Sequence, residues 1–252
     1  MDLDLRDRVY LVTGGARGLG RATAGCLVSE GARVVVSGRT EESLDAAVGE
    51  LGATQAVGIV ADNADPATPQ RLMAAATDAW GRLDGAVLSV GGPPAGNVLE
   101  VSDDDWSTSF DAVFLGALRL ARDVGLTLGE GGSIALVLSS TVKVPIGNLA
   151  ISNGLRPGLA MIAKSLADEL GPRGRRVNAL LPGRVDTERV QELDALSGDA
   201  AATRKQHLAA IPLGRYGEPE EFGRVAAFLM SPASSFVSGV MLPVDGGMLR
   251  AL

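Results

Sequence analysis

The segment that decides the fold lies near the start of the chain and reads Thr13-Gly14-Gly15-Ala16-Arg17-Gly18-Leu19-Gly20. It follows a strand-like apolar run over residues 9–13 and precedes a helical pattern that extends to about Glu30. Glycine lets a backbone approach a pyrophosphate closely, and the N-terminus of a helix offers free N–H groups to phosphates. The turn therefore predicts a dinucleotide site contacted by Gly14, Arg17, Gly18, Leu19 and Gly20.

Outward from this turn, short β-branched runs alternate with helical patterns along the whole chain. The pattern predicts strands over 9–13, 33–37, 55–60, 85–90, 133–139, 176–180 and 240–244. It predicts intervening helices over about 41–51, 66–80, 103–126, 153–170 and 218–230. Such alternation builds a doubly wound parallel sheet, the Rossmann fold, here as a single α/β domain over residues 1–252. Ligands in such sheets bind at the carboxyl ends of the strands.

Residues 186–213 form the one long interruption of this alternation. The stretch is polar and alanine-rich, and it follows the sixth expected strand. Long segments beside the ligand edge of a sheet commonly close over a site. We therefore expect residues 186–213 to act as a lid.

Composition excludes several other classes of protein. The formal net charge is −7, which disfavours nucleic-acid and membrane partners, since both present negative charge. Cys26 is the only cysteine, so no internal disulfide forms and a reducing compartment is expected. The charged N-terminus and the lack of a long apolar run predict neither a secretory signal nor a membrane span, so we expect a cytoplasmic protein. The carboxylates show no spacing typical of a metal site.

The end of the second expected strand selects the nucleotide. An acidic residue there would bind a ribose 2′-hydroxyl, whereas an arginine accommodates a 2′-phosphate. The sequence is Ser37-Gly38-Arg39-Thr40, with an arginine and no acid, and Arg17 adds a second positive charge. This favours NADP(H) over NAD(H), although Arg39 as a solvated surface residue stays an alternative. Asp62, followed by Asn63, is placed to accept from the adenine amino group.

Further motifs follow the later strands. They read Pro182-Gly183-Arg184-Val185-Asp186-Thr187, Leu213-Gly214-Arg215-Tyr216-Gly217-Glu218-Pro219-Glu220-Glu221 and Val244-Asp245-Gly246-Gly247. With the glycine turn and Asp62, the chain resembles the short-chain dehydrogenase/reductase family nearly end to end, close to the 3-oxoacyl carrier-protein reductase type. The resemblance implies that Gly91, Pro182, Gly183 and Val185 also line the cofactor, and that Thr187 holds its carboxamide. It further implies a homotetramer or dimer.

The catalytic positions depart from that family. Its members use an Asn, a Ser, a Tyr and a Lys, the last two four residues apart on one helix face. Aligned on Gly158-Leu159, the chain has Ser152 in place of the tyrosine and Arg156 in place of the lysine. Ser139, thirteen residues before Ser152, keeps the serine, whereas Val113 replaces the asparagine and Leu88-Ser89-Val90-Gly91 replaces Asn-Asn-Ala-Gly. Because Pro157 disfavours a helix interior, we expect this helix to begin only shortly before it.

Three functions remain open. A serine is too weak an acid to replace tyrosine, and an arginine cannot give up its proton. The first function is an NADPH-dependent reductase that delivers hydride to a pre-activated electrophile, such as an iminium, imine or hemiaminal-derived carbon. The second is a carbonyl reductase with a substituted acid, drawn from Ser139, Ser140, Lys143, Arg156, Arg184 and His207. The third is an inactive NADP(H)-binding homologue with a regulatory or structural role.

We expect the first of these functions, acting on a small-molecule substrate. Its candidate catalytic residues are Ser139, Ser152 and Arg156. If Arg156 faces the site, it reaches a ribose or phosphate of the cofactor; otherwise it pairs with an acid on another helix.

Overall fold

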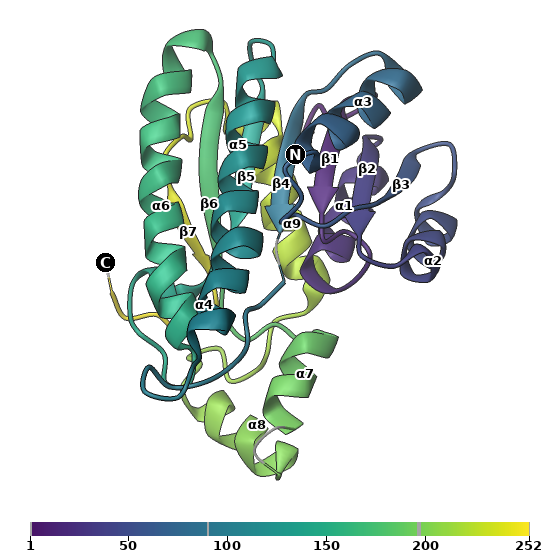
Figure 1. Cartoon of the computed structure of the whole chain (residues 1–252). Coiled ribbons are helices and arrows are strands. Elements are labelled where there is room, and N and C mark those ends of the chain that lie inside the picture. The colour runs from purple at the N-terminus through teal and green to yellow at the C-terminus, as the bar shows by residue number, and fades with distance from the viewer. Residues whose placement is uncertain (1, 90, 196–197, 252) are drawn as a thin grey trace.

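The computed structural model describes residues 2–89, 91–195 and 198–251. Within these ranges one parallel sheet has the strand order β3-β2-β1-β4-β5-β6-β7 (Figure 1). Its strands are β1 (Val9–Thr13), β2 (Arg33–Gly38), β3 (Ala56–Val60), β4 (Gly85–Ser89), β5 (Ser133–Val137), β6 (Arg176–Pro182) and β7 (Met241–Val244). The order reverses between β1 and β4, so the ligand crevice of a doubly wound fold lies at their carboxyl ends.

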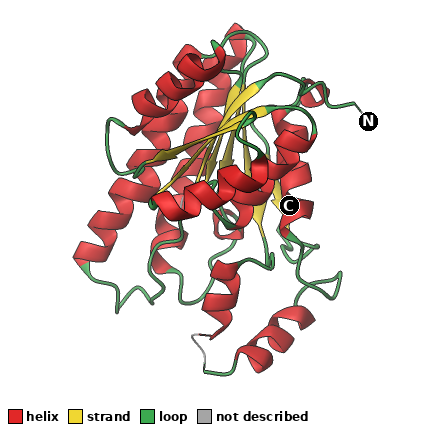
Figure 2. Cartoon of the chain, turned by 90° about the vertical axis from the view of Figure 1, so that its right-hand side faces the viewer, coloured by secondary structure: helices red, strands yellow, loops and turns green. Residues whose placement is uncertain are grey.

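Helices cover both faces of the sheet (Figure 2). One face packs against α1 (Gly18–Ser29), α2 (Glu41–Leu51) and α9 (Pro219–Met230), and the other against α3 (Thr68–Trp80), α5 (Gly116–Thr127) and α6 (Ala150–Leu170). Strand β1 shows why: successive side chains point to opposite faces, so Val9 and Leu11 enter one core, whereas Tyr10 and Val12 enter the other. The predicted fold class is confirmed.

The helix expected over 103–126 is three helical segments. These are α4 (Asp103–Ser109), a π-helical stretch (Phe110–Leu115) and α5, and the Gly116 N–H bonds to the Asp111 carbonyl, five residues back. At Gly116 the backbone presses on the segment after β3, where an added Cβ would lie 2.3 Å from the Asn63 carbonyl oxygen. π-Helical turns are frequent at functional sites. Buried Val113 lies within this one.

The segment expected to act as a lid carries two helices, α7 (Glu188–Ala195) and α8 (Ala200–Ala209). Figure 1 shows both helices beyond the carboxyl ends of the strands. In the described residues, no helix is long and apolar enough to cross a membrane.

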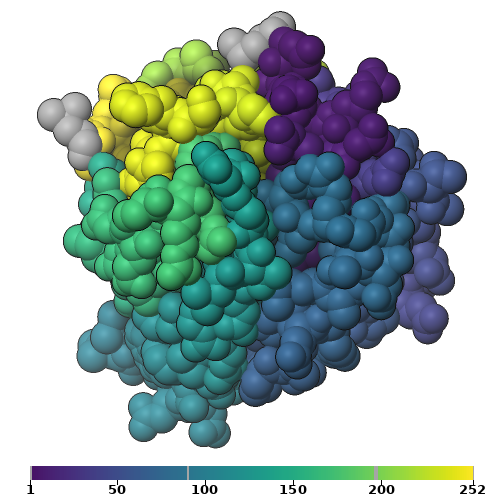
Figure 3. All heavy atoms as spheres, turned by 90° about the horizontal axis from the view of Figure 1, so that it is seen from above, coloured from purple at the N-terminus to yellow at the C-terminus, as the bar shows by residue number. Residues whose placement is uncertain are grey.

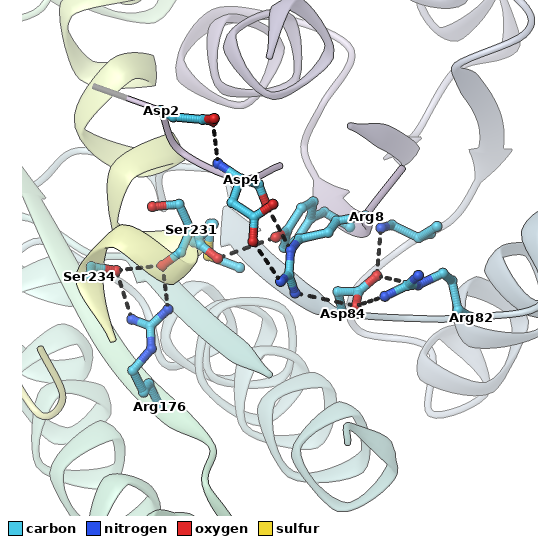
Figure 4. A network of polar contacts seen from close by, with 11 residues as sticks. Asp2, Asp4, Arg8, Arg82, Asp84, Arg176, Ser231 and Ser234 are labelled. Atoms are coloured by element: carbon cyan, nitrogen blue, oxygen red, sulfur yellow. Dashed lines mark hydrogen bonds and ion pairs between the residues drawn. The ribbon is translucent and has the colours of Figure 1, made fainter. Parts of the chain in front are cut away.

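The opposite end of the sheet is tied together by buried polar groups (Figure 4). The guanidinium of Arg176 donates to the carbonyls of Leu229 and Ser231 and to the Ser234 hydroxyl at 2.9–3.0 Å. Tyr10 donates to the Met230 carbonyl at 3.3 Å. Figure 3 looks onto this end, where purple N-terminal residues lie beside the yellow C-terminal part. Tyr10 and Arg176 therefore stabilise the fold at the end away from the ligand crevice.

Candidate nucleotide and active site

The turn after β1 lies directly against the end of β4. Thr13 Oγ1 donates to the Ser89 carbonyl at 2.7 Å. Gly14 has φ +61°, and a Cβ there would lie 3.1 Å from the same carbonyl oxygen. The left-handed backbone and the tight contact with the neighbouring strand both favour glycine at this position.

The same turn brings the start of α1 close to its own backbone. A Cβ on Gly20 would lie 2.3 Å from the Gly14 carbonyl oxygen, and Gly18 has φ +55°. Arg17 precedes α1, and its side chain caps none of the first N–H groups of the helix. Bare backbone and a positive helix end together make a cradle that fits a pyrophosphate.

Charged side chains surround this cradle. Arg39 after β2 is exposed and makes no hydrogen bond or ion pair with the described part of the chain. Arg17 is also exposed and lies 3.9 Å from the Glu192 carboxylate of α7. Asp62, after β3, is exposed and uses Oδ1 to accept from the Ala64 N–H at 2.9 Å, which leaves Oδ2 for a ligand. Two exposed arginines thus follow β1 and β2, at the edge of the sheet where ligands of this fold bind.

The segment after β6 closes the crevice from the other side. The Gly183 N–H donates to the Val244 carbonyl at 3.0 Å, and Val185 pairs with Gly217. This path carries Thr187 to within 3.7 Å of a Cβ built on Gly18, across the crevice from the glycine turn. The structure thus brings together the predicted residues that follow β1 and β6, including Leu19 in the first turn of α1 and Pro182 at the end of β6. Gly91 is exposed after β4, whereas Val90 lies outside the described residues.

The two serines at the catalytic positions both contact Thr141, Ser139 through its backbone N–H and Ser152 through its hydroxyl. Ser139 Oγ accepts from the Thr141 N–H at 3.2 Å, and the Thr141 hydroxyl lies 3.2 Å from Ser152 Oγ. Ser152 is 5% exposed and Thr141 is buried. The sequence argument missed Thr141, although its position two residues after Ser139 makes it a natural partner in the turn.

Arg156 is a buried cation held by main-chain oxygens. It is 6% exposed, and its Nη1 donates to the Val137 and Leu138 carbonyls at 3.0 and 3.1 Å. Burial lowers its pKa to about 10. The expected acidic partner is absent from the described residues, so that alternative is wrong. Nε and Nη2 make no hydrogen bond within this part of the chain.

The expected late start of the helix around Pro157 is also wrong. Helix α6 begins at Ala150, so Pro157 stands in its interior. Asn153 fixes the start through both ends of its amide, accepting from the Ile146 N–H at 3.0 Å and donating to the Ile146 carbonyl at 2.8 Å. This clamp holds the first turn of α6 against the preceding loop, although Pro157 removes one hydrogen bond from the helix interior.

Comparisons with known proteins agree with this geometry. A family model described as enoyl-(acyl carrier protein) reductase matches residues 14–249. An uncharacterized oxidoreductase of Mycobacterium tuberculosis is 34% identical over 96% of this chain and 92% of its own length. The 3-oxoacyl-[acyl-carrier-protein] reductase FabG of Vibrio cholerae is 30% identical over 98% of this chain and 99% of its own.

The chain belongs to the short-chain dehydrogenase/reductase family. Among solved structures, L-sorbose reductase from Gluconobacter frateurii, complexed with NADPH and L-sorbose, superposes with a TM-score of 0.92 at 26% identity over the full length of both chains. The predicted family is therefore confirmed. The prediction that the chain is an oxidoreductase is confirmed as well.

The side chains that could donate a proton are unusually placed for a short-chain dehydrogenase/reductase. Tyr10 lies at the far end of the sheet, and Tyr216 donates to the buried Asp194 carboxylate at 2.8 Å. Burial, and then the bond to Asp194, raise the pKa of Tyr216 to about 12. His207 and Arg184 contact the same carboxylate, at 3.3 and 3.1 Å. Neither tyrosine occupies the position of Ser152.

The remaining candidates for a substituted acid differ in exposure. Ser140 is buried and begins the 3₁₀ turn Ser140–Val142, whereas Lys143 is exposed just after it. Among the described residues, no group of three histidine, cysteine or acidic side chains is placed to hold a metal ion.

Proposed function

We propose that this chain is an NADPH-dependent reductase that delivers hydride to an already activated electrophilic carbon. The acceptor in this step is an iminium carbon, formed beforehand by protonation of an imine or by loss of water from a protonated hemiaminal. One observation carries the proposal: Ser152 stands where the resemblance expects a tyrosine acid, and it is buried with its hydroxyl beside Thr141. The chain keeps a nucleotide cradle while lacking the phenol.

Three observations support NADPH as the cofactor. The glycine turn leaves space that a Cβ would fill, and Arg17 and Arg39 flank it with positive charge. A structural relative was solved with NADPH. When bound, NADPH supplies the hydride. The chain's own part is to bind and orient: the N-terminus of α1 holds phosphate, and Thr187 closes the crevice opposite the turn.

Energetics favour an activated acceptor over a ketone. General-acid catalysis typically contributes about 10²–10⁴-fold, which corresponds to about 3–5.5 kcal/mol of barrier. A ketone needs a proton as its oxygen becomes an alkoxide, and neither Ser152 nor Arg156 is suited to give one. An iminium carbon becomes a neutral amine when it accepts hydride, so it needs no proton in that step. The Val137 and Leu138 carbonyls offset part of the Arg156 charge near such a substrate.

The test is turnover of matched pairs, a cyclic iminium compound and the ketone of the same ring size, with NADPH consumption as the readout. We expect kcat/KM for the iminium to exceed that for the ketone by at least about 10²-fold, the lower range of a missing general acid. Equal or faster ketone reduction contradicts the proposal. Tight NADPH binding without turnover of either member of broad panels of both classes favours the binding-only alternative instead.

A further inference from the structure

A buried carboxylate ties helix α7 to three other parts of the chain. Asp194, near the end of α7, is 3% exposed. Its Oδ2 accepts from the Tyr216 hydroxyl at 2.8 Å, and its Oδ1 accepts from Arg184 Nη1 at 3.1 Å. Nδ1 of His207, on α8, lies 3.3 Å from the same Oδ1. We call Arg184, Asp194, His207 and Tyr216 the Asp194 cluster.

The hydrogen-bond donors of the cluster determine the protonation state of His207. Arg184 Nη2 lies 2.9 Å from His207 Nε2, and a guanidinium nitrogen can only donate. Nε2 is therefore the acceptor, and the single ring proton is on Nδ1, facing Asp194 and the Tyr216 oxygen 3.2 Å away. His207 is neutral in this arrangement. Burial, and then the Arg184 charge, lower its pKa, against the opposing effect of Asp194.

The other contacts of α7 cross the nucleotide crevice. Thr187, just before the helix, and Glu188, its first residue, lie against Gly18, at 3.7 and 3.8 Å from a Cβ built there. Arg189 Nη2 donates to the Pro93 carbonyl, after β4, at 3.4 Å. Helix α7 thus touches the loops after both β1 and β4, while its far end is seated on the Asp194 cluster.

We propose that Asp194 is a positioning residue that holds α7 across the nucleotide crevice, and that protonation of His207 releases this hold. The part of the test that measures NADPH binding rests on the proposed function. Because Asp194 is buried, it acts on a bound nucleotide through Thr187 and Arg189. A protonated His207 can no longer accept from Arg184, and it places a second positive charge against that guanidinium.

The direction of the pH effect follows from the lowered pKa of His207. The arrangement in which the Asp194 cluster holds α7 favours the neutral His207 ring. Its stability is therefore greatest above the ordinary histidine pKa of about 6.5 and declines as the pH falls below that pKa. The charged and titratable groups around the ring are Arg184 after β6, Asp194 on α7 and Tyr216 before α9. Arg204 on α8 lies over the Tyr216 ring, with its guanidinium carbon 4.2 Å from the centroid.

The variants are Asp194→Asn and His207→Gln, with Lys205→Gln as the control. Glutamine keeps a donor and an acceptor but does not titrate near neutral pH. Lys205 is exposed on the same helix as His207, and among the described interactions it forms no hydrogen bond or ion pair with the cluster. Hydrogen exchange of peptides covering 188–195 is measured without nucleotide at several pH values, corrected for intrinsic exchange rates. NADPH affinity is measured in parallel, and urea unfolding checks the global fold.

We expect Asp194→Asn to speed exchange in α7 and to weaken NADPH binding about tenfold, as loss of a charge-assisted hydrogen bond implies. In the wild type and in Lys205→Gln, exchange and the dissociation constant both rise as the pH falls from 7.5 to 5.5. In His207→Gln the pH dependence of exchange disappears, and the dissociation constant keeps only the part of the rise that comes from protonation of the 2′-phosphate of NADPH. The proposal is overturned if Asp194→Asn matches the control in both readouts, or if His207→Gln keeps the full pH dependence. If the wild type binds no NADPH, the proposed function fails, while the exchange data still test the cluster.

Discussion

Replacing Gly20 by alanine tests the nucleotide cradle at its tightest point. The new Cβ would lie 2.3 Å from the Gly14 carbonyl oxygen and 2.8 Å from its carbon, both backbone atoms of the turn. The turn must open by about 1 Å to restore an ordinary contact. Misplacement on this scale costs about 10²-fold where geometry is critical. We therefore expect the NADPH dissociation constant to rise by about 10- to 100-fold in Gly20→Ala.

Gly25→Ala is the matched control because Gly25 lies on the same helix, α1. Its added Cβ meets only Arg21 Nη1, at 3.7 Å. Alanine in a helix interior is favoured by up to about 1 kcal/mol over glycine, so this variant should be slightly more stable. NADPH fluorescence titration and urea unfolding separate binding from folding. A folded Gly20→Ala that binds NADPH as tightly as Gly25→Ala would refute the cradle.

Three further predictions concern selectivity, catalysis and stability. Arg39→Ala should reduce the preference for NADPH over NADH about tenfold or more, with little change in NADH affinity, because it removes a phosphate partner; an unchanged ratio of dissociation constants would make Arg39 a solvated residue. The double variant Ser152→Tyr with Arg156→Lys should raise ketone turnover relative to iminium turnover, and an unaltered ratio would mean that these positions do not supply the acid. Arg176→Met should lower the free energy of unfolding by about 2–4 kcal/mol, since it leaves buried carbonyls unpaired; a urea midpoint equal to that of the exposed-site variant Arg122→Met would contradict this.

The fold follows from the sequence because its signals are local. The β1 run and the glycine turn specify a strand, a tight turn and a helix within twenty residues. The alternation of strand-like and helical patterns along the rest of the chain then predicts the parallel sheet. The tertiary features are different. The π-helical turn around Val113 depends on the close approach of Gly116 to Asn63, and the start of α6 depends on the clamp between Asn153 and Ile146. No periodicity in the sequence encodes either contact.

The candidate site likewise has residues that the sequence predicts and residues whose role depends on tertiary contacts. Gly14, Gly18 and Gly20 are predictable because each occupies a motif position where a positive φ or a close contact with backbone favours glycine. The environment of Arg156 could not be predicted, because its partners are main-chain oxygens, which every residue type has. Asp194 was missed because Arg184, His207 and Tyr216, which contact it, lie 10 to 22 residues away in the chain.

The most direct test of hydride transfer without a protein acid is a single-turnover measurement of NADPH oxidation with a cyclic iminium substrate, in H₂O and in D₂O and with NADPH deuterated at the transferred position. No proton moves with the hydride in the proposed step. We therefore predict a clear slowing with deuterated NADPH and a rate equal in the two solvents. A substantial solvent isotope effect that multiplies with the hydride effect would show a proton in flight and would contradict the proposed function.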